Sequence, residues 1–496
     1  MKRIASFAAG LLFLSGLTLA PACSEDTPEP TTTPDGGDTD SGAVVTPLGD
    51  PAVPCADSQD AVYGDPGPLP ADKGAILKCN KGTELTKDQI QTRLAAINYV
   101  GKPATSGANV YRVTYRTERG DDKNTPGYSS AIVFSPTTPR ANNLPIIVYG
   151  RGTRGQAARC SVSLDDAATS DDLARWAFPL VGAGYAVIIP DLAGYSNYGA
   201  PGNPPSAYAQ AADVGKSTLD GSRALKKMFP QLDDKTVLVG HSQGGHSVLA
   251  ALSLGETYGA QGTIAGVVGY APLWLSQRSW GAILEPGVAE ATPGYPIATA
   301  GLPSAIAVWY HYEQAELLDG PGEGLKLFKA DKQAVIKEYV DTACVGDYKL
   351  LADNASHVYK LFEGSFVTAI AAPAAGFGAG CQGNPVCEKW IKRYTADRPH
   401  LTGAAATTPI LLLYGGADTT IPPERMRCAL DRLKEDGVNM SFCFEAAATH
   451  GSIIDQKSDY VSDWIANLTL GGPAPAACAA NESAVTAECA TPPPND

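Results

Sequence analysis

The stretch that decides the fold runs from Val237 to Gly245 and reads Val-Leu-Val-Gly-His-Ser-Gln-Gly-Gly. An apolar, strand-forming run leads directly into Gly240-His241-Ser242-Gln243-Gly244, which has the spacing GxSxG. A serine in this pattern lies on a sharp turn between a strand and a helix, which exposes its hydroxyl, and the flanking glycines remove side chains that would collide in the bend. Ser242 is therefore the candidate nucleophile.

The flanking sequence separates this interpretation from a simpler one. A serine before a helix is often only an N-cap, whose hydroxyl accepts a backbone N–H. Here Asp233-Asp234-Lys235 predicts a turn before the strand, and the run from Gly245 to Glu256 predicts a helix that is buried on much of its surface. Strand, turn and helix thus follow in the order that a nucleophile elbow requires.

A serine hydroxyl becomes a good nucleophile only when a base removes its proton, and a carboxylate usually orients that base. The chain has six histidines, and His450 lies in a loop directly after the strand-like run 439–445. Asp418 follows the strand-like run 409–414 in the same way. Along the chain the order is serine, acid, histidine, which is the order found in catalytic triads built around a nucleophile elbow. We predict that Asp418 orients His450, which acts as the general base.

Both residues also have simpler interpretations, and these stay open at this point. The simpler interpretation of Asp418 is an N-cap of a helix that begins near Pro422, because aspartate is common before a helix that starts with proline. His450 could be an ordinary surface histidine. Asp191, after the strand-like run 185–190, is a rival carboxylate, but it precedes the serine in the chain. We therefore expect Asp191 to brace a loop.

The tetrahedral intermediate carries an oxyanion, and backbone N–H groups must face it. The N–H of Gln243, the residue after the serine, is the first candidate donor. The strand-like run 144–149 ends in a glycine-rich turn at 150–155, where the backbone can approach a substrate closely. From this turn we predict the N–H of Thr153 as the second donor, with Gly152 as the next choice. An ordinary exposed turn would have the same composition.

Strands and helices are predicted to alternate along most of the chain, after two early strands with an antiparallel pattern. This alternation of strands and helices predicts an α/β fold with a mostly parallel central sheet and helices on both faces. The interval 273–405 interrupts it, and we expect a largely helical cap over the active site there. The predicted strands are 110–117, 129–134, 145–149, 185–190, 236–240, 264–270, 409–414 and 439–444, and the helices are 170–182, 211–228, 244–257, 422–436 and 453–467.

Four segments resemble the α/β-hydrolase superfamily, and in particular its secretory lipase family of capped extracellular lipases and esterases. The resemblance spans about residues 105–468 and is strongest around the serine and the acid. It implies the α/β-hydrolase fold and hydrolysis of carboxylic esters, whereas the residues by themselves imply only acyl transfer through a serine. The segments are 149–153, which has Arg151 where the family's loop tends to have histidine; Pro190-Asp191 with Gly194; 240–245; and 415–423 with His450.

We therefore predict a serine esterase or lipase that forms an acyl-enzyme on Ser242. This chemistry needs no cofactor and no metal, and we expect a monomer that acts on a small-molecule or lipid-like ester. A net charge of −14 and the lack of a basic run argue against a nucleic-acid partner. Two alternatives stay open: a serine peptidase or amidase on the same fold, and a non-catalytic surface binding protein built on a hydrolase scaffold.

The N-terminus predicts export, because Lys2-Arg3 precedes an apolar stretch that ends in Ala20-Pro21-Ala22-Cys23. This end resembles a bacterial lipoprotein signal, which implies that Cys23 is lipidated and that the anchor makes the only membrane contact. We predict a protein that is secreted or anchored to the bacterial cell envelope. The predicted order is a signal peptide at 1–22, a disordered tether at 23–54, the hydrolase core at 55–272 and 406–470, the cap at 273–405 and a tail at 471–496.

The cysteines fit an exported protein. Of eleven cysteines, ten are left when Cys23 carries a lipid, and ten can form five disulfides in an oxidising compartment. Spacing along the chain suggests four pairs, although it cannot establish connectivity. The suggested pairs are Cys55 with Cys79, Cys381 with Cys387, Cys428 with Cys443, and Cys478 with Cys489.

Overall fold

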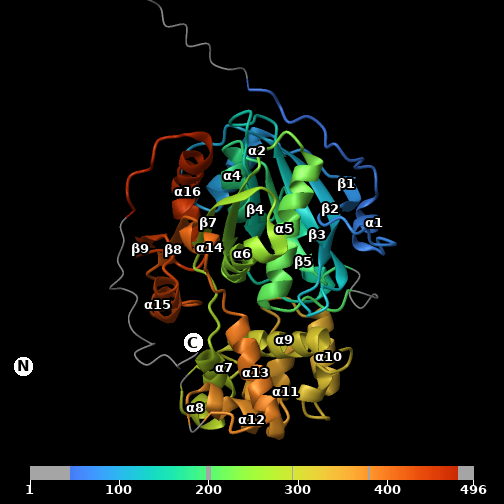
Figure 1. Cartoon of the computed structure of the whole chain (residues 1–496), viewed down its shortest axis with the longest axis vertical. Helices are drawn as coiled ribbons and strands as arrows, with labels where there is room; N and C mark the ends of the chain where they lie inside the picture. The colour runs from blue at the N-terminus through green and yellow to red at the C-terminus, as the bar shows by residue number, and fades with distance from the viewer. Residues whose placement is uncertain (1–44, 197–202, 293, 378–379, 479–496) are drawn as a thin grey trace, which may run out of the picture. The chain divides into compact units, whose positions relative to one another are not determined.

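The computed structural model describes residues 45–196, 203–292, 294–377 and 380–478. Its centre is a nine-stranded sheet in the order β1-β2-β3-β5-β4-β6-β7-β8-β9 (Figure 1). The first three strands form an antiparallel meander that joins β5, and the remaining strands pair in parallel. The strands are β1 (Ile76–Lys81), β2 (Ala108–Glu118), β3 (Pro126–Pro136), β4 (Ile146–Gly150), β5 (Val187–Ala193), β6 (Lys235–His241), β7 (Thr263–Tyr270), β8 (Ile410–Gly415) and β9 (Met440–Glu445).

Helices cover both faces of this sheet, which confirms the predicted fold class (Figure 1). Helices α5 and α6 pack against each other on one face, and α3, α4 and α16 pack on the other. The central strands are apolar and fully buried because helices lie on both of their sides. The core helices are α1 (Gln59–Tyr63), α2 (Lys87–Ala96), α3 (Asp171–Trp176), α4 (Phe178–Gly182), α5 (Ala211–Met228), α6 (Gln243–Leu254), α14 (Ala404–Thr407), α15 (Arg427–Glu435) and α16 (Ser452–Leu470).

All eight predicted strands are present, and two predicted helices differ: the one at 422–436 begins as a 3-10 turn at Pro423–Met426 before α15. The helix expected at 170–182 is divided into α3 and α4, which meet at Ala177. Pro179 lies in the first turn of α4 and has no N–H with which to continue the hydrogen-bond ladder of α3. Strand β1 was not predicted from the sequence, and it pairs along β2 at the edge of the sheet.

Between β7 and β8, helices α7 to α13 form a separate group, which we call the cap. These helices enclose their own hydrophobic cluster, which also includes Leu273, from the segment before α7, and Tyr208 and Ala209 from the core. His311 lies at its centre, between Ala307 O and the Tyr394 hydroxyl, and burial lowers its pKa to about 3. The cap helices are α7 (Gln277–Leu284), α8 (Pro286–Ala291), α9 (Gly301–Leu318), α10 (Gln333–Thr342), α11 (Lys349–Asn354), α12 (Gly364–Ala374) and α13 (Pro385–Ala396).

Asp397, directly after α13, joins the cap to both helices on one face of the sheet. Its carboxyl group accepts hydrogen bonds from Ala211 N, at the start of α5, at 3.0 Å and from the Tyr310 hydroxyl at 2.6 Å. Its backbone carbonyl lies 2.6 Å from Nε2 of His246 in α6. Burial raises the pKa of Asp397 to about 7. These hydrogen bonds offset the cost of burying the carboxyl group of Asp397 in this joint.

Four disulfides lie within the described residues, and two of the four predicted pairs are correct. Cys55–Cys79 and Cys381–Cys387 are present. The pairs of Cys443 with Cys428 and of Cys478 with Cys489 were wrong, because Cys443 is bonded to Cys478. After α16 the chain returns to β9, a proximity that spacing along the sequence does not encode. The fourth disulfide, Cys160–Cys344, joins the core to the cap across 184 positions of sequence.

The N-terminal part of the described chain differs from the predicted tether. Residues 45–54 lie on the core: Leu48 is buried, and Ala52 N donates to Met228 O at 2.7 Å. Apolar contact and a backbone hydrogen bond hold this stretch, so a tether would end before it. The predicted signal peptide and Cys23 lie outside the described residues. Within those residues, no helix has the length and apolar character to cross a membrane, and no cluster of three or more His, Cys, Asp or Glu residues could hold a metal ion.

A buried ion pair fastens the turn after β2 to α5, and it provides a test of the fold. Asp213 accepts hydrogen bonds from Arg119 Nε at 2.9 Å and from Gly120 N at 2.8 Å, and both charged side chains are almost fully buried. We expect Asp213→Ala to lower the free energy of unfolding by about 3–5 kcal/mol, because it leaves a buried guanidinium without its carboxylate. Urea denaturation measures this change.

Asp353→Ala is the matched control, since Asp353 pairs with Lys349 on an exposed helix surface. Exposed pairs of this kind contribute less than about 1 kcal/mol. Similar losses in the two variants would contradict a structural role for the buried pair.

Candidate active site

Ser242 has the backbone conformation of a nucleophile elbow. It lies between β6 and α6 with φ 55° and ψ −119°, a region that residues other than glycine rarely adopt. Backbone hydrogen bonds on both sides hold it there: Ser242 N donates to Tyr270 O, and Leu273 N donates to Ser242 O, each at 2.9 Å. Its side chain makes no capping hydrogen bond to α6. The alternative that Ser242 is only a helix N-cap is therefore wrong.

Two glycines allow the close approach that this turn needs. A Cβ atom at Gly244 would lie 1.9 Å from Gly150 O, and one at Gly240 would lie 2.2 Å from Gly244 O. No side chain fits at either place. The start of α6 thus lies directly against the end of β4, and the serine turn is next to the glycine-rich turn that was predicted to hold the second oxyanion donor.

His450 and Asp418 are brought together by the loops after β9 and β8. Nδ1 of His450 lies 2.7 Å from Oδ2 of Asp418, and the carboxylate is almost completely buried. The other oxygen, Oδ1, accepts from Thr420 N at 2.8 Å and from Ile421 N at 2.9 Å. One oxygen of Asp418 thus braces the local turn while the other meets the imidazole. Nδ1–H of His450 donates, so its Nε2 is left to take a proton.

His241 links the elbow to the His450 loop, a role that the sequence analysis missed. Its Nε2 lies 2.9 Å from the backbone carbonyl of His450, and the two imidazole centroids are 4.6 Å apart. A carbonyl oxygen only accepts, so Nε2 of His241 carries the proton and donates. Burial lowers the pKa of His241 well below its usual range, which keeps the ring neutral. The residue before the serine thereby fixes the position of the loop that carries His450.

Arg151 joins the two predicted sides of the oxyanion hole. Its buried guanidinium donates through Nη1 to Gly152 O at 3.0 Å and to Gln243 Oε1 at 3.2 Å. Through Nη2 it donates to Asp191 O at 2.9 Å. The arginine therefore points inward and holds the turn after β4 against the residue that follows the serine. The sequence showed only that Arg151 stands where the family's loop tends to have histidine, and it did not indicate these contacts.

Thr153 and Asp191 also take up defined positions. The hydroxyl of Thr153 lies 2.8 Å from the hydroxyl of Tyr208. The carboxylate of Asp191 accepts from the Ser130 hydroxyl at 2.7 Å and from Ser163 N at 3.0 Å. The prediction that Asp191 braces a loop is therefore confirmed.

The predicted site residues are connected to different extents. Asp418 and His450 are in direct contact, His450 is joined to the elbow through His241, and Gln243 is joined to Gly152 through Arg151. This arrangement places a strained serine beside an imidazole loop and a glycine-rich turn, the parts from which serine acyl transfer is built. The catalytic roles of the individual residues stay predictions.

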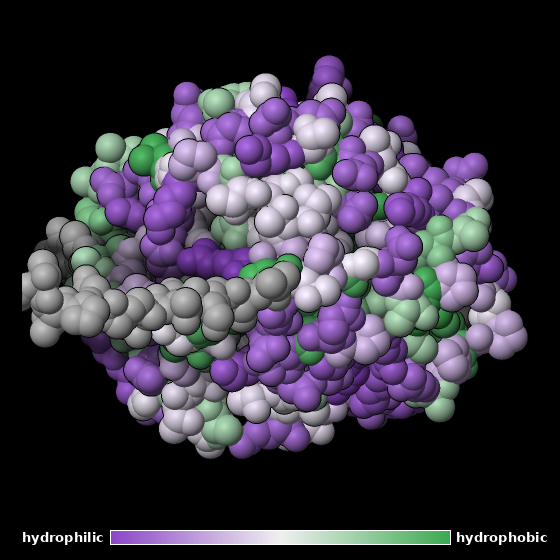
Figure 2. Space-filling model, turned by 90° about the horizontal axis from the view of Figure 1, so that it is seen from above, coloured by the Kyte–Doolittle hydropathy of each residue, from purple (hydrophilic) through white to green (hydrophobic). Residues whose placement is uncertain are grey.

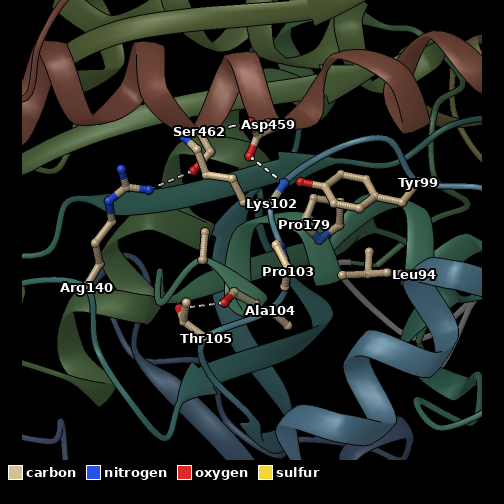
Figure 3. A pocket seen from close by; sticks show the side chains of 12 residues that line it. Leu94, Tyr99, Lys102, Pro103, Ala104, Thr105, Arg140, Pro179, Asp459 and Ser462 are labelled. Atoms are coloured by element: carbon tan, nitrogen blue, oxygen red, sulfur yellow. Dashed lines mark hydrogen bonds and ion pairs between the residues drawn. The ribbon is translucent and has the colours of Figure 1, made fainter.

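A separate cavity of about 230 Å³ lies between α2, α4 and α16 (Figure 3). Figure 2 looks onto this end of the core, where polar residues predominate and apolar areas are small and separate. Lys102 on the cavity wall pairs with Asp463 at 2.6 Å, and Arg140 donates to the Ser462 hydroxyl at 3.0 Å. The cavity is lined by none of the predicted site residues, and its two cations already have partners, so we do not assign it a catalytic role.

Fold and site together define an α/β hydrolase with a nucleophile elbow. Residues 167–456 match the model of a family described as the alpha/beta hydrolase family. Because this match covers more than half of the chain, the protein belongs to that family. A comparison with curated proteins found no match.

Solved structures with a similar fold include an esterase and a lipase. One is the rice cell wall degrading esterase LipA from Xanthomonas oryzae, with a TM-score of 0.56 and 19% identity over 81% of this chain and 97% of that one. The other is lipase A of Candida antarctica in its closed state, with a TM-score of 0.57 and 18% identity over 86% of this chain and 89% of that one. At such identities the similarity shows the fold.

The contact between Gly244 and Gly150 gives a testable prediction. We expect Gly244→Ala to lower the free energy of unfolding by about 1–3 kcal/mol or more, because the added methyl group would overlap the backbone of β4. Gly364→Ala, in the first turn of α12, is the control, since no atom lies within 4 Å of the added Cβ. It should be neutral or slightly stabilising. Chemical denaturation of both variants measures the difference, and equal stability would contradict the close approach.

Proposed function

We propose that the protein is a serine carboxylic ester hydrolase, an esterase or lipase, that forms an acyl-enzyme on Ser242. The observation that carries the proposal is the combination of a strained serine turn with an imidazole and a buried carboxylate 2.7 Å apart, in the chain order serine, acid, histidine. The names of the two similar structures, an esterase and a lipase, support ester rather than amide substrates.

In this mechanism His450 accepts the proton of the Ser242 hydroxyl through Nε2 as the oxygen attacks the ester carbonyl. Asp418 holds the imidazole in the required tautomer and stabilises the imidazolium that forms. The backbone N–H groups of Gln243 and Thr153, with Gly152 as the next choice, face the oxyanion. His450 then protonates the leaving alcohol. In the second half of the reaction His450 takes a proton from water as the water oxygen attacks the acyl carbonyl, and it returns that proton to the Ser242 oxygen as the carboxylic acid leaves.

We also propose that the protein is exported and works outside the cytoplasm. Four disulfides within the described residues support an oxidising environment, since such bonds are rare where thiols are kept reduced. A lipid on Cys23 would tether the enzyme to the cell envelope. Mass spectrometry of the mature N-terminus would test this, and an unmodified cysteine would contradict the anchor.

The first test of the proposed function is hydrolysis of p-nitrophenyl esters with acyl chains of increasing length. We expect turnover by the wild type and none above background by Ser242→Ala, because the nucleophile is missing. Ser253→Ala, on the same helix, is the control and should retain activity. The optimal chain length separates a short-acyl esterase from a lipase. Activity on a peptide panel in place of the esters would favour the peptidase alternative.

A fluorophosphonate probe tests the third possibility, a binding protein on a hydrolase scaffold. A reactive Ser242 should be labelled in the wild type and in Ser253→Ala. Ser242→Ala should remain unlabelled. A wild type that hydrolyses no ester or peptide and does not react with the probe would contradict a catalytic serine.

The contact between Asp418 and His450 makes a second prediction. Asp418→Asn keeps Oδ1 for the backbone N–H groups of Thr420 and Ile421, so we expect the fold to persist. Because an amide stabilises the wrong imidazole tautomer, kcat should fall on the order of 10⁴-fold. Steady-state kinetics measures this change. Asp191→Asn, the rival carboxylate, should lose far less, and a larger loss there would reassign the acid.

A further inference from the structure

Glu313 is a buried carboxyl group on cap helix α9, and only 1% of this residue is exposed. Its Oε2 accepts two hydrogen bonds from the core, one from Gln156 Nε2 at 2.8 Å and one from Tyr208 N at 3.1 Å. Gln156 comes three positions after Thr153, and Tyr208 lies in the segment before α5. A single side chain of the cap therefore holds two separate segments of the core.

Tyr208 carries this contact to the predicted oxyanion loop. Its hydroxyl lies 2.8 Å from Thr153 Oγ1, and its ring packs on Trp309 with the two centroids 6.1 Å apart. Trp309 and Glu313 are four positions apart, so they lie on the same face of α9. This face holds both the ring and the backbone of Tyr208. A displacement of Tyr208 would therefore move the side chain of Thr153 with it.

The far end of the same loop is fastened to the cap independently of Glu313. Cys160 is bonded to Cys344, and Val345 N donates to Arg154 O at 2.9 Å. These links hold the stretch from Arg154 to Cys160. Nearer the serine, Arg151 holds Gly152 O, and between these anchors the side chain of Thr153 contacts Tyr208, which the carboxyl group of Glu313 supports.

Both donors to the carboxyl group of Glu313 meet Oε2, and Oε1 has no hydrogen-bond partner among the described residues. Burial raises the pKa of Glu313 well above its usual range. Glutamine has nearly the same shape and the same carbonyl acceptor, without a charge. Glutamine at position 313 should thus preserve both hydrogen bonds, and alanine should remove them.

We propose that Glu313 is a positioning residue for the oxyanion loop, which through Tyr208 holds Thr153 where negative charge develops in the transition state. The proposal rests on the function proposed above. Glu313 acts through other residues and touches no reacting atom. Donors aimed at an oxyanion act more strongly on the transition state than on the bound substrate. A loosened Thr153 should therefore lower kcat and leave KM almost unchanged.

The test compares four variants of the full chain with the wild type. Glu313→Ala removes the support, Glu313→Gln retains it, and Tyr208→Phe removes only the hydroxyl that reaches Thr153. Glu338→Ala, an exposed glutamate of cap helix α10, is the control. For each protein we would measure kcat and KM with the p-nitrophenyl ester that the wild type hydrolyses best. Hydrogen–deuterium exchange of peptides covering residues 150–160 gives a readout that does not need activity.

We expect Glu313→Ala and Tyr208→Phe to lower kcat by about tenfold or more with KM within about threefold, because one oxyanion donor is worth about 10²–10³ in kcat when it is lost completely. Glu313→Gln and the control should stay within about threefold of the wild type in both constants. Exchange near Thr153 should become faster in Glu313→Ala and stay slow in Glu313→Gln.

A kcat in Glu313→Ala equal to that of the control would overturn the proposal, as would a change confined to KM. If Glu313→Ala does not fold, Tyr208→Phe decides, and wild-type kcat in that variant would overturn it. A wild type without ester hydrolysis would instead refute the proposed function. The exchange measurement then still decides, because unchanged exchange in Glu313→Ala would show that Glu313 does not hold the loop.

Discussion

The backbone of Gly244 at the start of α6 lies against the backbone of Gly150 at the end of β4, with no room for a side chain between them. The two strands that lead to this contact are parallel neighbours in which Gly150 is in register with Gly240. Their carboxyl ends therefore meet at one edge of the sheet. The serine turn and the glycine-rich turn are held side by side by main chain alone, and every other part of the site is placed relative to this contact.

The imidazole and the carboxylate reach that edge from two further parallel strands. Asp418 lies in the loop after β8, and His450 lies in the loop after β9. Because these two strands are neighbours in the sheet, their loops lie side by side and the two side chains come within 2.7 Å of each other. The loop of His450 is also bound directly to the elbow, because the neutral ring of His241 donates to its backbone carbonyl. A main-chain carbonyl is thus used to position the His450 loop, and the contact of Nδ1 with Asp418 leaves Nε2 of His450 for the proposed proton transfer.

The cap is joined to the core by buried polar groups and by a covalent bond. Asp397 meets the first turn of α5, Glu313 meets the segment before it, and the Cys160–Cys344 disulfide closes a third link. Burial raises the pKa of both carboxyl groups. Each accepts hydrogen bonds that offset part of the loss of water. The side of the cap formed by α9 and the end of α13 is therefore fixed to the core beside the candidate site. Any movement of the cap would have to involve its other helices.

The sequence by itself determined the alternation of strands and helices, the serine turn and the two loops that carry Asp418 and His450. Alternating apolar runs and glycine spacing are local properties of the chain. Local pattern also located β6 and α6, although Pro179 divided one predicted helix. Only the tertiary structure decided the partners of His241, Arg151 and Glu313, and the Cys443–Cys478 disulfide. These contacts join segments far apart in the chain, and they depend on which strands become neighbours and where the cap docks, which no local pattern encodes.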